Sequence, residues 1–273
     1  MRTKLGETHS RGCGAVDPRI SPAQRVPSYT PDDVVTSVGT PIVWIDASAV
    51  SMAFGVEQPT FSDRMGNSFI KQGDKAPWQM PNAFNGRNCW RMCGQTGTSS
   101  TSTAGVTNMR SNSSITIATN YTMFAVLRVH HPACGNYGTA AMIFRHSDLD
   151  GNPDNFYMFY DSNGAMGMTF RDATGGNYAA RTKAGEPVIF SSVAASTPTQ
   201  KFYVNGTKGG IDGSSALTFT NPRYLYWTYS VAAYSYPCNN DLAEYIVYSS
   251  VLSDADRRAV ESYLGRKYGV IVA

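Results

Sequence analysis

The sequence is poor in charge: only 16% of its 273 residues are Asp, Glu, Lys or Arg, against about 25% in an average soluble domain. Disordered chains are rich in charge and poor in aromatic residues, whereas this chain is 12% aromatic, which excludes general disorder. The net charge of +3 is too small to make nucleic acid the expected partner. Long hydrophobic runs are also missing, since none approaches the roughly 18–20 residues that span a bilayer. We therefore expect neither nucleic acid nor a membrane among the partners.

What the sequence does contain, from residue 41 onward, is a series of short runs rich in β-branched and aromatic residues. Clusters of Gly, Asn, Asp and Ser separate these runs, and no helical segment lies between them. This pattern predicts an antiparallel sandwich and argues against a parallel α/β sheet. The predicted strands cover residues 42–45, 121–129, 141–144, 156–160, 165–170, 188–193, 201–204, 224–229 and 242–248.

The end of the chain predicts one α-helix. Ser253 is a suitable N-cap and is followed by two aspartates in the first turn, where the helix dipole favours negative charge. Apolar residues then recur at helical spacing, and Gly269 stands where a C-terminal cap needs a left-handed residue. We expect this helix to pack on the sandwich.

Residues 1–38 differ from the rest because Pro18, Pro22, Pro27 and Pro31 interrupt them every four or five residues. Proline fixes φ and removes a backbone donor, so the segment is predicted to be an extended arm outside a domain that covers residues 39–273. The arm is either a loose terminus or a tether that lies across another subunit.

Four motifs resemble one family. Residues 43–48 (VWIDAS), 201–207 (KFYVNGT), 241–248 (DLAEYIVY) and 252–269 (LSDADRRAVESYLGRKYG) resemble the laminin-G-like, concanavalin A-like jelly rolls found in virion proteins of tailed bacteriophages. The resemblance implies an all-β concanavalin A-like antiparallel sandwich, or jelly roll, with one C-terminal α-helix. It also implies a structural role on the virion surface after assembly in the host cytoplasm.

Within that role, the arm favours capsid decoration or a head fibre, with residues 1–38 contacting other virion subunits and a homo-oligomer as a further option. The alternative is a carbohydrate-binding adhesin or a tail receptor-binding protein that contacts a host-surface glycan. Catalysis is not expected. Concanavalin A-like glycosidases use Glu-x-Asp-x-x-Glu, and none of the five glutamates here lies in such a motif.

No cofactor is expected, although two metal sites were considered. Asp148, Asp150, Asn152 and Asp154 place oxygen donors at alternate positions, as calcium loops do. Position 12 of such a loop would be Phe159 in place of a bidentate glutamate, so a solvated turn is favoured over calcium. A zinc site would need residues 89–93 and 130–134 to meet, and their spacing departs from the usual Cys-x-x-Cys.

The cysteines are odd in number, so they cannot all pair within one chain. Cys13 lies in the arm between two glycines, which suggests either a disulfide to a neighbouring subunit or a reduced thiol. Cys89 and Cys93 are four residues apart and could bridge only if the backbone turned between them.

Tyrosine is abundant, with 16 in the chain. Flat rings with a polar tip suit both sugar faces and protein interfaces, and they also fill sandwich cores. The densest run, residues 224–236, is expected to present an exposed aromatic surface. Its candidate glycan or partner contacts are Tyr224, Tyr226, Trp227, Tyr234 and Tyr236.

Overall fold

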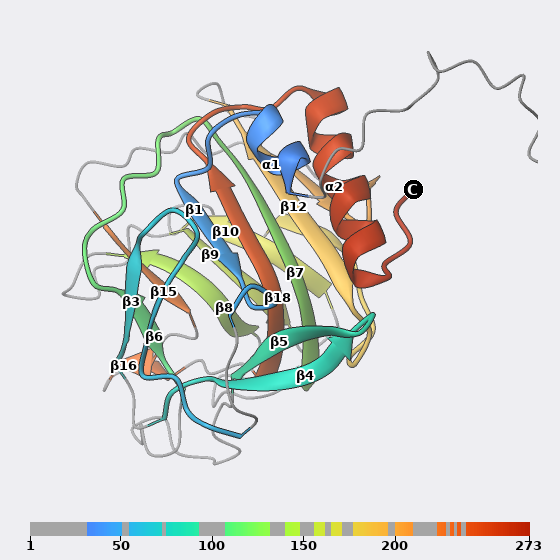
Figure 1. Cartoon of the computed structure of the whole chain (residues 1–273). Helices are drawn as coiled ribbons and strands as arrows, with labels where there is room; N and C mark the ends of the chain where they lie inside the picture. The colour runs from blue at the N-terminus through green and yellow to red at the C-terminus, as the bar shows by residue number, and fades with distance from the viewer. Residues whose placement is uncertain are drawn as a thin grey trace, which may run out of the picture.

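The computed structural model is an all-β sandwich of two antiparallel sheets with a helix against one of them (Figure 1). It describes residues 32–50, 55–72, 75–92, 107–131, 140–147, 156–161, 165–170, 177–195, 200–209, 223–227, 230–231, 234–235 and 239–273.

The first sheet has the order β14-β13-β12-β7-β18-β5-β4, and β1 pairs with β18 beside it. Its strands are β1 (Val43–Asp46), β4 (Trp78–Phe84), β5 (Arg87–Met92), β7 (Tyr121–His131), β12 (Val188–Ala194), β13 (Gln200–Val204), β14 (Thr207–Lys208) and β18 (Asn239–Tyr248).

The second sheet has the order β11-β10-β9-β8-β15-β6-β3-β2, and β16 (Ser230–Val231) pairs separately with β17 (Tyr234–Ser235). Its strands are β2 (Thr60–Ser62), β3 (Ser68–Lys71), β6 (Met109–Ser111), β8 (Ala140–Ser147), β9 (Phe156–Asp161), β10 (Ala165–Phe170), β11 (Asn177–Arg181) and β15 (Tyr224–Trp227). These strands confirm the predicted sandwich.

Two apolar layers hold the sandwich together. The inner layer lies between the sheets and includes Trp90, Trp227 and Tyr245. The outer layer lies between the first sheet and α2 (Asp254–Tyr268) and includes Phe124, Ile246 and Leu264. Removal of these side chains from water is the main stabilising contribution to the fold.

The predicted helix boundaries are confirmed. The Ser253 hydroxyl accepts a hydrogen bond from the Asp256 backbone N–H at 3.1 Å, which satisfies one of the first free donors of α2. At the other end, Gly269 has a φ of 72° and closes the helix as its left-handed cap. The hairpin turn between β13 and β14 is also confirmed, because Asn205 and Gly206 both have positive φ.

Strand β18 is covered on both faces, but its alternation is interrupted. The register with β7 shifts between Leu242 and Glu244. As a result, Ala243 and Glu244 both lie on the side of α2, where Ala243 belongs to the outer layer and Glu244 contacts Lys267. Strict alternation along residues 241–248 would place Ala243 on the same face as Tyr245, but the bulge places two consecutive residues on one face.

The prediction of an extended arm over residues 1–38 is wrong for its last residues. Asp33–Ser37 form the short helix α1, and Val35 within it is fully buried. The Tyr248 hydroxyl donates to the Val35 carbonyl oxygen at 2.9 Å. Tertiary packing, rather than helix propensity, holds so short a helix. Residues 1–31 lie outside the described residues. Among the residues that are described, no helix is long and apolar enough to cross a membrane.

Candidate functional site

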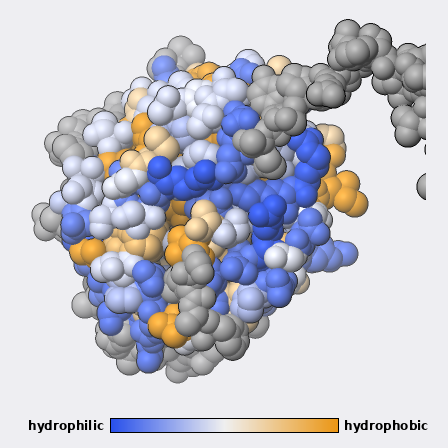
Figure 2. Space-filling view, viewed as in Figure 1, coloured by the Kyte–Doolittle hydropathy of each residue, from blue (hydrophilic) through white to orange (hydrophobic). Residues whose placement is uncertain are grey.

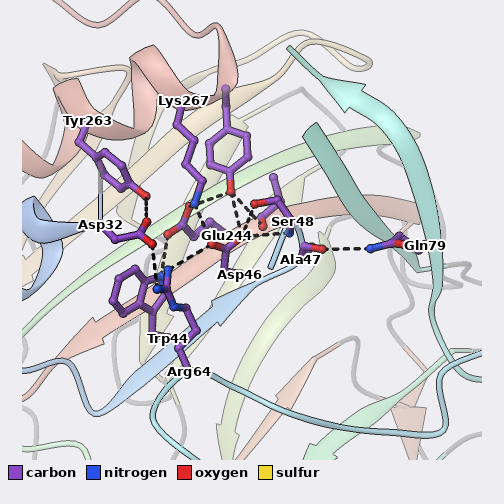
Figure 3. Close-up of polar contacts among 12 residues, drawn as sticks. Asp32, Trp44, Asp46, Ala47, Ser48, Arg64, Gln79, Glu244, Tyr263 and Lys267 are labelled. Carbon is purple, nitrogen blue, oxygen red and sulfur yellow. Dashed lines mark hydrogen bonds and ion pairs between the residues drawn. The ribbon is translucent and has the colours of Figure 1, made fainter. Parts of the chain in front are cut away.

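Three of the four family-like motifs meet in a buried group of charged side chains where α2 crosses β1 and β18 (Figure 3). Lys267 of α2 places Nζ 2.8 Å from Asp46 Oδ2 and 2.8 Å from Glu244 Oε2. These three residues are 9%, 5% and 1% exposed, respectively. One buried ammonium is therefore paired with two buried carboxylates.

Glu244 accepts two further hydrogen bonds. Trp44 donates its indole N–H to Oε1 at 2.7 Å, and the Tyr268 hydroxyl donates to Oε2 at 2.7 Å. Burial raises the pKa of Glu244, while the nearby Lys267 ammonium opposes the rise. These contacts join β1, β18 and α2 to one another. The motifs that carry the resemblance thus serve the fold.

Arg64 extends the buried group to the surface. Its guanidinium lies 3.9 Å from the centre of the Trp44 ring, and one nitrogen is 3.5 Å from Asp46 Oδ2. A second nitrogen donates to Asp32 Oδ2 at 2.8 Å, which holds the pKa of that carboxyl below its usual value. The side chain is 32% exposed. Arg64 therefore presents a fixed cation at the protein surface.

The loop that carries Arg64 is held by Asp63. Its carboxylate accepts hydrogen bonds from the backbone N–H groups of Trp44 at 3.0 Å, Met65 at 3.0 Å and Asn67 at 2.7 Å. Gly66 supplies the positive φ that the turn needs. The loop conformation, and with it the position of Arg64, is thus set by local hydrogen bonds.

A cavity of about 170 Å³ opens beside this loop. Gln79 donates its amide to the carbonyl oxygens of Ala47 and Val50, at 3.1 and 2.5 Å, and so fixes one wall. The lining combines carboxylates, a guanidinium, a hydroxyl and apolar surface, and consists of Ile45, Asp46, Ala49, Val50, Ser62, Asp63, Arg64 and Trp90. On the face shown in Figure 2, hydrophilic residues predominate and the hydrophobic patches are small.

The structure corrects the expected aromatic surface at residues 224–236. Trp227 is 1% exposed and stacks between Trp90 and Phe144 in the inner layer, and Tyr226 is 6% exposed. Apolar residues fill both faces of β15, so alternation alone did not reveal which ring was covered. Tyr224 is half-buried, with the Arg110 guanidinium 4.7 Å from its ring centre. The side chain of Tyr234 and all of Tyr236 lie outside the description.

Other predicted site residues also fall outside the described residues: Cys13, Asp148, Asp150, Asn152, Asp154, Cys93 and Cys134. Cys89 is a buried free thiol whose pKa is raised by burial. Among the residues that are described, no three His, Cys, Asp or Glu side chains are grouped to hold a metal ion.

Sequence reasoning missed Asp63, Arg64 and Trp90. The one available signal was Asp63 followed three residues later by Gly66, a pair typical of a tight turn. It predicts a loop but does not indicate that Arg64 meets Asp46 and Asp32, which are 18 and 32 residues away along the chain.

No protein-family model and no curated protein sequence matches the chain. Solved structures resemble it in fold. Domain 4 of AbnA, a GH43 extracellular arabinanase from Geobacillus stearothermophilus solved with arabinotriose, matches with a TM-score of 0.55 and 10% identity over 82% of this chain and 98% of that one. This likeness identifies the fold as one also adopted by a domain of a glycan-cleaving enzyme, and nothing more.

A mutant of Trypanosoma rangeli sialidase displaying trans-sialidase activity also matches with a TM-score of 0.55 and 10% identity, over 89% of this chain. The chain spans about a third of the length of the sialidase chains it matches, 38% in this case. The Ruminococcus gnavus sialidase domain CBM40, bound to sialyllactose, has a TM-score of 0.44 and 16% identity over 53% of this chain and 84% of that one.

Proposed function

We propose that this domain binds a glycan, as an adhesin or receptor-binding protein does, and that one sugar unit occupies the cavity beside Arg64. The observation that carries the proposal is the convergence of Arg64, Asp46, Asp63 and Trp90 on one cavity. Sugar hydroxyls both donate and accept hydrogen bonds, and sugar rings have apolar C–H faces. A pocket with a few fixed polar groups and apolar walls suits such a ligand.

The size of the cavity supports a single sugar unit. Pockets for drug-sized ligands measure about 300–1,000 Å³, whereas this one measures about 170 Å³. A longer glycan would extend from the cavity over the surrounding surface. The sandwich solved with arabinotriose provides a precedent for a sugar ligand on this fold.

Binding without hydrolysis fits the state of the two carboxylates in the cavity. Glycosidases require one carboxyl group to transfer a proton and a second to activate water or attack the sugar. Asp63 accepts three backbone N–H groups, and Asp46 accepts from Lys267 Nζ at 2.8 Å and from the Ser48 hydroxyl at 2.6 Å. Both carboxylates are engaged in hydrogen bonds within the protein, so the partly exposed guanidinium of Arg64 is the main contact for a ligand.

A glycan array, followed by titration calorimetry with the best sugar, tests the proposal. Arg64→Ala should weaken binding at least about tenfold, since a charge-assisted hydrogen bond contributes about 1.5–3 kcal/mol. Ser62→Tyr, which fills the cavity from an exposed position on β2, should abolish binding without disturbing the buried charges. Arg258→Ala, on the exposed side of α2, is the matched control. Unchanged binding by Ser62→Tyr would refute the proposal, as would the absence of any bound glycan.

A place on a phage virion remains a prediction from sequence. Residues 1–31 of the anchoring arm predicted over residues 1–38 lie outside the described residues, and three of the motifs that resemble virion proteins form the buried charged group. Such a location is compatible with glycan binding, because the alternative drawn from the sequence was a tail protein that recognises a host-surface glycan.

A further inference from the structure

A second group of charged residues lies on the outer face of the first sheet, near the start of β18 and beside the β4–β5 hairpin (Figure 1). Its centre is Asp241, whose side chain is fully buried. Arg91 of β5 and Arg128 of β7 stand directly opposite Asp241 in the two neighbouring strands. The register of the sheet therefore brings two guanidiniums to one carboxylate.

The contacts around Asp241 are short. Arg91 donates from Nε to Oδ1 at 2.7 Å and from a terminal nitrogen to Oδ2 at 3.0 Å. Arg128 donates to Oδ2 from Nε at 3.1 Å and from a terminal nitrogen at 2.5 Å. His130 Nε2 lies 2.8 Å from Oδ2. Burial alone would raise the pKa of Asp241, but these three partners hold it well below its usual value.

Two guanidiniums and one imidazole surround the single carboxylate of Asp241. All three also remain in contact with solvent, since the side chains of Arg91, Arg128 and His130 are 27%, 20% and 33% exposed. The buried carboxylate thus fixes two arginine side chains and an imidazole whose outer parts face solvent.

We propose that Arg91, Arg128 and His130 together bind an oxyanion, that is a carboxylate, sulfate or phosphate group. Guanidinium groups match the planar, two-oxygen edge of such anions better than ammonium groups do. Arg91 lies on the outer face of β5, whereas its neighbour Trp90, which lines the cavity, belongs to the inner layer between the sheets. This proposal therefore does not depend on glycan binding at Arg64.

The orientation of Arg128 supports the proposal. Its Nε and one terminal nitrogen are engaged by Asp241, so the other terminal nitrogen points away from that carboxylate. The Phe84 ring lies 5.1 Å from the guanidinium carbon and restricts its movement. An anion thus meets a donor that is already fixed, which reduces the entropy lost on binding.

The surroundings favour an anion over a cation. Behind the group lies Cys89, a buried thiol whose pKa is raised by burial and, next, by the charge of Asp241. That thiol is therefore neutral and adds no negative charge. Both oxygens of Asp241 already accept hydrogen bonds from guanidiniums, so this carboxylate is not available to a metal ion.

The test uses the full chain labelled with ¹⁵N, titrated separately with sodium sulfate, sodium phosphate and sodium acetate at an ionic strength held constant with sodium chloride. The arginine Nε–H signals report on each guanidinium. We expect at least one oxyanion to shift the Arg91 and Arg128 signals in a saturable way. Comparing the three salts then separates sulfate or phosphate recognition from carboxylate recognition.

Two variants locate the site. Arg128→Gln should weaken the response of Arg91 at least about tenfold in dissociation constant, and Arg258→Gln, remote on α2, should leave it unchanged. If Arg128→Gln does not fold, Arg91→Gln serves instead, because Arg128 still neutralises Asp241. The proposal would be overturned if the arginine Nε–H shifts rose linearly with salt concentration, or if sodium chloride produced the same shifts. It would also be overturned if the shifts were retained in these variants.

Discussion

The ammonium of Lys267 and the carboxylate of Glu244 lie 2.8 Å apart in the interior, where they are 9% and 1% exposed. A second carboxylate, that of Asp46, depends on the same ammonium at 2.8 Å. The two contacts join the end of α2 to β18 and β1. Removing the ammonium would leave two buried carboxylates without their main counter-charge, which costs more than the pair itself contributes.

We therefore expect Lys267→Met to lower the free energy of unfolding by about 3–5 kcal/mol, measured by urea denaturation at neutral pH. Lys183→Met, at a side chain that is 83% exposed, is the matched control and should change it by less than about 0.5 kcal/mol. Adding Glu244→Gln to Lys267→Met should recover part of the loss, because it removes one of the two unpaired charges. Equal stability of Lys267→Met and the control would contradict this account of the junction.

His146 should make stability depend on pH. It is 1% exposed, its Nε2 lies 2.8 Å from the Ile115 carbonyl oxygen, and burial lowers its pKa from 6.5 to about 4. The unfolded chain therefore binds a proton near pH 6.5, whereas the folded chain does not until about pH 4. The contribution of His146 to the free energy of unfolding is fully present above pH 6.5. It is lost as the pH falls toward 4, which lowers the free energy of unfolding by up to about 3 kcal/mol.

The measurement is the free energy of unfolding between pH 7.5 and about 4.5, above the range in which Asp241 titrates in the unfolded state. His146→Gln should show a clearly shallower decline than the natural sequence over this window. If both proteins decline in parallel, His146 is not the group responsible.

The boundary of the folded domain can be tested by truncation. Deleting residues 1–31 should leave the melting temperature nearly unchanged. Deleting residues 1–38 removes Val35, which is fully buried, and Asp32, which accepts from Arg64 at 2.8 Å and from Tyr263 at 3.1 Å. That longer deletion should lower stability by about 2–4 kcal/mol. Equal melting temperatures for the two truncated chains would show that α1 does not contribute.

Replacing Gly265 by alanine tests whether the chain after α2 packs against this helix, because the two cases predict opposite changes in stability. In an exposed helix position, Gly→Ala stabilises by about 1 kcal/mol. Here an added Cβ would lie 2.7 Å from the Val270 carbonyl oxygen and 2.7 Å from a Val272 methyl group. Gly265→Ala should therefore destabilise the domain by about 1–3 kcal/mol, as measured by thermal unfolding. A rise in stability would mean that the segment after α2 does not pack against this helix.

Local features of the fold were predictable from the sequence. The caps of α2 at Ser253 and Gly269 and the turn at Asn205 and Gly206 depend on residues only a few positions apart. Features that depend on distant partners were not. Trp44 and Glu244 are hydrogen-bonded across 200 positions, and neither motif alone shows that the two residues meet. The motifs indicated the fold correctly, but they did not indicate that Ile45 and Asp46 line a cavity.

The candidate site was harder to predict for a related reason. Tyr226 and Trp227 were expected at the surface because an alternating strand must turn one set of rings outward. The same alternation is compatible with burial of both sets, which is what the structure shows. Arg64 gave no comparable signal, because its role arises from a turn fixed by Asp63 and from Asp32 on another element.

A crystal structure of the protein grown with the best ligand from the array would show whether the cavity beside Arg64 holds a sugar. We expect a sugar unit among Asp46, Ser62, Arg64 and Trp90, with at least one of its oxygens within hydrogen-bonding distance of the Arg64 guanidinium. A sugar bound elsewhere, for example over Tyr224 on the second sheet, with this cavity holding only water, would contradict it.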